Sequence, residues 1–129
     1  MISFLTATAA AVVLTAMQAS IEIPRKNFGV CLSSALNAAI TQKIAVSDYS
    51  AFVRATCRAQ ADGLKSGLIG FDVKNGISRG QAAADAQAQI DDYLTMAAER
   101  YESRMSRLKA AATTPAEAPP PTQVAAPKQ

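Results

Sequence analysis

The sequence predicts an all-α protein, in which an αα-hairpin and a long third helix are held by one disulfide bond and followed by a disordered C-terminal tail. Apolar residues recur every three or four positions along three stretches, as on the buried face of a helix. The only two cysteines lie at equal distances from a predicted turn, and five of the six prolines follow residue 113. With 129 residues, the chain is long enough for at most one domain.

The composition indicates a small hydrophobic core. Half of the residues are apolar, but many of these are alanine, aromatic residues make up 5%, and tryptophan is absent. A short chain with so little apolar volume usually needs a covalent cross-link or a partner subunit. The net charge of +3 is too small to indicate a nucleic-acid partner, and none is expected.

The N-terminal segment has the features of a secretory signal peptide. Residues 1–20 carry no charge, and a run of small apolar residues extends from Ile2 to Met17. We therefore expect a signal peptide at 1–19, cleaved after Ala19, a helical domain at 20–112, and a periplasmic or secreted location. The alternative is an uncleaved membrane anchor, although the run has about 16 residues where about 20 are needed to span a bilayer.

The first helix is predicted at residues 28–43. Its apolar residues fall on one face at spacings of three or four. Asn27 is a suitable N-cap for this helix, and Pro24 fits just before or at its start.

The second helix is expected to begin at Ser47, a suitable N-cap, and to run to about Lys74. Two glycines, Gly67 and Gly70, each cost up to about 1 kcal/mol relative to alanine, so the alternative is a break near Gly67. We favour the continuous helix because apolar residues keep the helical spacing through this region. We expect Asn75-Gly76 to form a helix cap and turn, because the residues that follow offer no second arm for a β-hairpin.

The third helix has the clearest pattern. Ser78 and Gln81 match a capping box, and the helix should run for about 30 residues from there. Residues 113–129 are rich in proline and contain no large apolar residue other than Val124, which predicts a disordered tail. The apolar stripe of the helix comprises Ala83, Ala86, Ile90, Leu94, Ala97, Tyr101, Met105 and Leu108.

Cys31 and Cys57 are predicted to form a disulfide bond. Residue 44, midway between them, falls in the turn expected between the first two helices, and both cysteines lie on apolar stripes. In an antiparallel helix pair, positions equidistant from the turn face each other, which allows the Cβ separation of about 4 Å that a disulfide requires. Export would also place both thiols in an oxidising compartment. The alternative is a reactive thiol at Cys57, activated by Arg54 and Arg58.

The absence of histidine limits the chemistry available to this chain. It excludes Ser-His-Asp and Cys-His catalysis and removes the commonest zinc ligand. No catalytic motif, cofactor, metal site or small-molecule substrate is identified, so an enzyme is not expected; one using Asp, Glu, Lys or Tyr is the alternative. The acidic pair Asp91 and Asp92 is read as a solvated helix face, because adjacent helical side chains point about 100° apart.

Three arginines of the third helix are a candidate anion-binding site. Arg100, Arg104 and Arg107 repeat at helical spacing and form a ridge suited to an anionic envelope component, such as lipid headgroups. The alternative is an ordinary helix end, where the dipole favours cations and Glu99 and Glu102 partly balance the charge.

The far end of the third helix is a candidate partner face. This helix should extend beyond the first one, which would leave Tyr101, Met105 and Leu108 partly uncovered. Such a face predicts a protein partner or a homodimer. The sequence therefore favours a periplasmic or secreted structural or interaction protein that acts through the third helix, with an anion-binding envelope module as the alternative.

The segment FDVKNGISRGQAAADAQAQIDDY, together with the upstream Cys57, resembles a group of short, uncharacterised exported proteins of alphaproteobacteria. The resemblance extends over about residues 21–101. It implies export, and it implies no functional residue because the group has no assigned activity.

Overall fold

The computed structural model describes the backbone of residues 9–113 and the side chains from Ile21 onward. The described chain is helical, with α1 at Ala9–Gln42, α2 at Val46–Thr56, α3 at Arg58–Lys74 and α4 at Arg79–Thr113. The all-α prediction is confirmed. The tail expected at 113–129 lies outside the described residues except for Thr113, which ends α4, and the first eight residues of the expected signal peptide also lie outside them.

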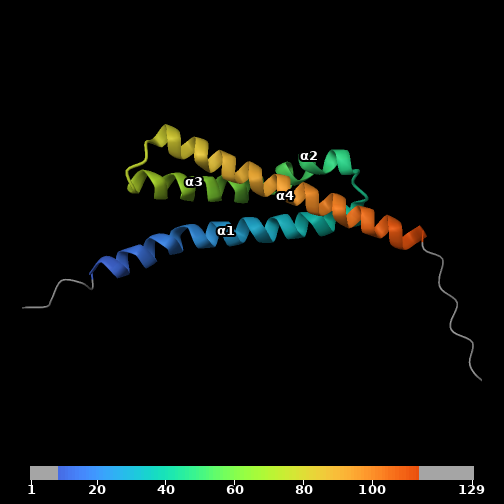
Figure 1. The fold of residues 1–129 in the computed structure, drawn as a ribbon, viewed down its shortest axis with the longest axis horizontal. Coiled ribbons are helices and arrows are strands. Elements are labelled where there is room, and N and C mark those ends of the chain that lie inside the picture. Colours follow the sequence, from blue (N-terminus) through green and yellow to red (C-terminus); the bar gives the residue numbers. More distant parts are fainter. Residues whose placement is uncertain (1–8, 114–129) are drawn as a thin grey trace, which may run out of the picture.

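The chain runs along the bundle three times (Figure 1). α1 runs in one direction, α2 and α3 return in the opposite direction, and α4 runs back alongside them. α3 packs against both α1 and α4, whereas α2 packs mainly against α4 and α1 touches α4 over a shorter stretch. The last turns of α4 extend past the end of α1 in this view. The bundle therefore has a loose seam between α1 and α4.

The second predicted helix is divided at Cys57, so the expected hairpin of two continuous helices is replaced by α1 facing the pair α2 and α3. Cys57 has φ −104° and ψ 17°, outside the helical range. The hydroxyl of Thr56 donates a hydrogen bond to the carbonyl oxygen of Phe52 at 2.8 Å. Thr95 makes the same kind of bond, to the carbonyl oxygen of Asp91, inside the unbroken α4, so this bond alone does not explain the break. As predicted, the helix continues through Gly67 and Gly70 to Lys74.

Two predicted helix starts are wrong. α1 is continuous through Pro24, so Asn27 is an interior residue and not its N-cap. α2 begins one residue before Ser47, and its N-cap is Ala45, which has extended backbone angles and no side-chain acceptor. The Ser47 hydroxyl donates to the carboxylate of Asp48 instead, at 3.2 Å.

Two helix ends share one backbone motif. After α1, the Lys43 N–H donates to Ile40 O and the Ile44 N–H donates to Ala39 O, with Lys43 at a φ of 54°. This is a Schellman motif with a lysine in the left-handed position that glycine usually occupies. α3 ends in the same way, with Gly76 at a φ of 90°. The predicted cap at Asn75-Gly76 is therefore confirmed.

The start of α4 agrees in part with the predicted capping box. The Gln81 backbone N–H donates to the Ser78 hydroxyl at 3.3 Å. The Gln81 side chain donates to Asp85 instead of returning to the cap. Of the two hydrogen bonds of a capping box, the one to the Ser78 hydroxyl is therefore formed, and the Gln81 side chain does not form the reciprocal one.

The core lies along the inner face of each helix. The buried residues of α4 follow the predicted stripe, except that Ala82 replaces Ala83 and that Met105 and Leu108 are not fully buried. Alanines in the first half of α4 allow α3 to approach closely. The fully buried large side chains are Tyr49, Tyr101, Phe28, Leu64, Val53 and Cys57.

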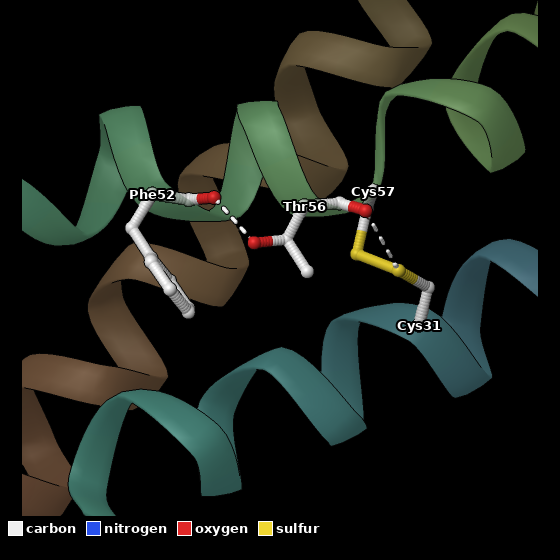
Figure 2. The surroundings of a disulfide bond; sticks show 4 residues. All are labelled: Cys31, Phe52, Thr56 and Cys57. Carbon is white, nitrogen blue, oxygen red and sulfur yellow. Dashed lines mark hydrogen bonds between the residues drawn. A yellow bond between two sulfur atoms is a disulfide. The ribbon is translucent and has the colours of Figure 1, made fainter. Parts of the chain in front are cut away.

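The predicted disulfide between Cys31 and Cys57 is confirmed, with an S–S distance of 2.02 Å and Cα atoms 5.7 Å apart. Figure 2 shows it crossing from the middle of α1 to the junction of α2 and α3. The Cys31 sulfur lies 3.9 Å from the carbonyl oxygen of Thr56. Because both sulfurs are bonded and Cys57 is buried, the alternative of a reactive thiol at Cys57 is not supported in this state.

Candidate functional site

The three arginines line a groove at the seam between α1 and α4. Arg100, Arg104 and Arg107 are exposed residues of α4, and Leu36 of α1 lies across from them. The groove has a volume of about 550 Å³. It exists because α1 packs mainly on α3 and touches α4 less, which leaves space beside the second half of α4. The remaining lining residues are Met96, Glu99 and Ser103.

The groove carries an excess of positive charge. Three guanidinium groups and one carboxylate, that of Glu99, line it. Within the described part of the chain, Arg100 and Arg104 form no ion pair, and the Arg107 Nε donates only to the carbonyl oxygen of Ser103, at 3.4 Å. Guanidinium groups without a carboxylate partner remain available to bind an anion.

An apolar hollow adjoins the charged groove. It has a volume of about 140 Å³ and shares Leu36, Met96 and Arg100 with the groove. Leu32 and Tyr93 complete its apolar wall, and Met96 is 41% exposed. The seam between α1 and α4 thus offers apolar contact and positive charge side by side, a combination suited to an anionic ligand that also has an apolar part.

The predicted partner face is wrong at Tyr101, which is fully buried. The Tyr101 hydroxyl donates to the carbonyl oxygen of Ile44 at 2.6 Å, and its ring stacks on Tyr49. The turn after α1 and the start of α2 therefore cover a position that we expected to be open. Met105 is half-buried against the core, and Leu108 is 44% exposed.

The acidic pair on α4 is separated as the helical geometry requires. Asp91 accepts hydrogen bonds from the Gln87 amide at 3.2 Å and from Arg54 at 3.1 Å, and these bonds lower the pKa of its carboxyl group. Asp92 is exposed. No group of three or more His, Cys, Asp or Glu side chains in the described chain is placed to hold a metal ion.

None of the described helices combines the length and the apolar character needed to cross a bilayer. Comparisons with protein-family models, with curated proteins and with solved structures found no match to this chain.

Proposed function

We propose that this chain is a small exported binding protein, and that the groove between α1 and α4 holds an acidic segment of a partner protein. The observation that carries the proposal is the set of three exposed arginines that line one groove with apolar side chains. The proposed contact lies on the arginine side of the third predicted helix and not on the side that bears Tyr101.

Two features support export. A disulfide that joins distant parts of a small core is typical of proteins in oxidising compartments. The uncharged N-terminal segment is consistent with a signal peptide.

The spacing of the arginines supports an acidic helical segment as the ligand. At about 1.5 Å per residue, Arg100 and Arg107 are separated by about 10 Å along α4. Carboxylates three and four residues apart on a partner helix repeat over the same distance and can each meet one guanidinium group. An apolar residue on the same face would enter the hollow beside Leu36 and Met96.

Charge and shape favour this ligand over two others. Two copies that paired through the same groove would place arginines opposite arginines, which costs free energy. A layer of lipid headgroups would meet the guanidinium groups but would present nothing of fixed shape to the hollow. A partner segment with both carboxylates and an apolar side chain uses both parts of the surface.

Site-specific photo-crosslinking in the cell of origin tests the proposal. A photoreactive residue replaces Ser103, which lines the groove, and in a control chain it replaces the exposed Ser66 of α3. We expect the Ser103 position to form an adduct with a protein segment that carries at least two carboxylates at helical spacing. The yield of this adduct should fall as the salt concentration is raised, because salt screens the ion pairs that hold the segment. The Ser66 position should not form the adduct.

Matched charge variants complete the test. Arg100→Gln/Arg104→Gln/Arg107→Gln should abolish the adduct, whereas Lys26→Gln/Lys74→Gln/Arg79→Gln removes the same charge elsewhere and should leave it. Adducts only with lipid, adducts with a second copy of this chain, or an adduct that survives loss of the three arginines would each overturn the proposal.

A further inference from the structure

A second cavity lies at the junction where α2 ends and α3 begins. It has a volume of about 250 Å³ and is bounded by the helix junction, by α4 and by Phe28 of α1. It shares no lining residue with the arginine groove or with the hollow beside it. Residues on both sides of the break at Cys57 line this cavity, among them Arg54 of α2 and Arg58 of α3.

The inner wall of this cavity is apolar and well supported by the core. Five of its side chains are almost fully buried: Phe28, Val53, Cys57, Ile90 and Leu94. The disulfide holds Cys57 in this wall, and the ring of Phe28 is fixed by an edge-to-face contact with Tyr93, with ring centroids 5.8 Å apart. A wall of this kind is set before a ligand arrives.

The rim of the cavity is cationic. Arg54, Arg58 and Lys65 stand at the opening with one lining carboxylate, Asp62. Asp62 lies 4.0 Å from Arg58, and both side chains are largely exposed, at 71% and 85%, so this pair binds weakly. Arg54 is paired with Asp91, which lies on the adjoining turn of α4.

Lys65 is the rim cation that forms no ion pair. It is partly buried, and its Nζ donates at 2.7 Å to the neutral side-chain oxygen of Gln87. Among the described residues, no carboxylate lies within ion-pair distance of Lys65. The amide of Gln87 in turn donates to Asp91, so the acceptor beside Lys65 is held in place. The Asp91 carboxylate attracts this ammonium group from beyond ion-pair distance. The neutral amide of Gln87 is the acceptor of its side-chain hydrogen bond, so its remaining N–H groups can bind an anion.

We propose that this cavity binds a small amphipathic monocarboxylate, with its carboxylate at Lys65 and Arg58 and its hydrocarbon part against Phe28, Ile90 and Leu94. An apolar cavity of about 150 Å³ can bind benzene, so about 250 Å³ has room for a carboxylate with a chain of about six carbons. The proposal goes beyond the acidic-segment proposal, because it concerns another site and another class of ligand.

The first test is a titration of the isotope-labelled, disulfide-bonded protein with hexanoate, followed through its amide NMR signals. Hexylamine and 1-hexanol, which have the same chain and a different head group, are the matched probes. We expect saturable shifts at Ala61, Gln87 and Ile90 with hexanoate, at about 1 mM or tighter. Binding by 1-hexanol should be at least several-fold weaker, and hexylamine should bind least. No saturable shift at these residues, or hexylamine binding as well as hexanoate, would overturn the proposal.

Variants then assign the roles of the rim and the wall. Lys65→Met keeps the hydrocarbon stem and removes the charge, so it should weaken hexanoate binding several-fold and leave 1-hexanol unchanged. Arg58→Gln, at an exposed position, should act in the same direction without affecting the fold. Arg104→Gln, in the other groove, is the control and should change nothing. Hexanoate binding that is unaffected by both Lys65→Met and Arg58→Gln would contradict the proposed carboxylate site, whatever the outcome of the crosslinking experiment.

Discussion

Tyr49 of α2 and Tyr101 of α4 stack face to face, with ring centroids 4.1 Å apart and ring planes 9° from parallel. Their hydroxyl groups differ. The Tyr101 hydroxyl donates to the carbonyl oxygen of Ile44, whereas the buried hydroxyl of Tyr49 has no hydrogen-bond partner among the described residues. The stack joins α2 to α4, and the Tyr101 hydrogen bond also fixes the turn that follows α1.

The two hydroxyls should therefore contribute in opposite directions to the free energy of unfolding. Tyr101→Phe leaves the carbonyl of Ile44 without its donor and should lower that free energy by about 1–2 kcal/mol. Tyr49→Phe removes a buried polar atom that has no partner and should leave it unchanged or raise it. Urea denaturation of both variants checks this. An equal loss in the two variants would show that the hydrogen bond to Ile44 does not distinguish them.

The disulfide should supply a large part of the stability of this small core. Its cysteines are 26 residues apart in sequence. Closing a loop of that length lowers the entropy of the unfolded chain by an amount worth about 3–4 kcal/mol. We expect Cys31→Ala/Cys57→Ala to lose about that much in denaturant unfolding, and reduction of the native protein to give a similar loss. A loss below about 1 kcal/mol in both experiments would mean that helix packing alone holds the fold.

The left-handed residues at the two Schellman motifs should respond to substitution in opposite ways. Lys43→Gly removes the steric cost of a φ of 54° and should raise the free energy of unfolding by about 1 kcal/mol. Gly76→Ala introduces that cost at a φ of 90° and should lower it by a similar amount. Lys26→Gly, at an exposed position inside α1, is the control and should destabilise because glycine disfavours a helix interior. Thermal unfolding of the three variants measures the differences, and destabilisation by Lys43→Gly would be the contrary result.

Protonation of Asp91 at acidic pH should lower the free energy of unfolding by a small amount. Hydrogen bonds from Gln87, then from Arg54, hold the pKa of the Asp91 carboxyl below its ordinary value. Because the folded-state pKa is lowered, the stabilisation is present above the unfolded pKa of about 4 and is lost as the pH falls through the folded pKa. Gln87→Ala should move the pKa of Asp91 back toward its ordinary value, as measured by NMR titration of the carboxyl carbon. An unchanged pKa in this variant would show that the amide does not stabilise the carboxylate.

The features that the sequence predicted correctly depend on local rules. The spacing of apolar residues identified three helical stretches, although not the start of α1 or the break between α2 and α3. Asn75-Gly76 marked a helix end, and the placement of Cys31 and Cys57 about residue 44 identified the disulfide. These predictions follow from helical periodicity or from the conformational freedom of glycine. Both rules apply to short stretches of sequence and require no knowledge of distant contacts.

The features that the sequence did not predict are not visible in the spacing of apolar residues. The break at Cys57 falls at a position where that spacing is uninterrupted. The burial of Tyr101 depends on Tyr49 and Ile44, which are more than 50 residues away in sequence. The arginines were found as a ridge, but the groove that they line depends on where α1 lies, which helix periodicity does not specify.

The oxidation state of Cys31 and Cys57 in the cell bears on both the stability of the core and the proposed export, because a disulfide forms in an oxidising compartment. The measurement that tests it is the intact mass of the protein recovered from its own cells, alkylated before and after reduction. We predict the mass of a chain that begins at Ser20, and that this chain is alkylated at two sites only after reduction. A full-length mass with two freely alkylated thiols would contradict both the disulfide and the proposed export.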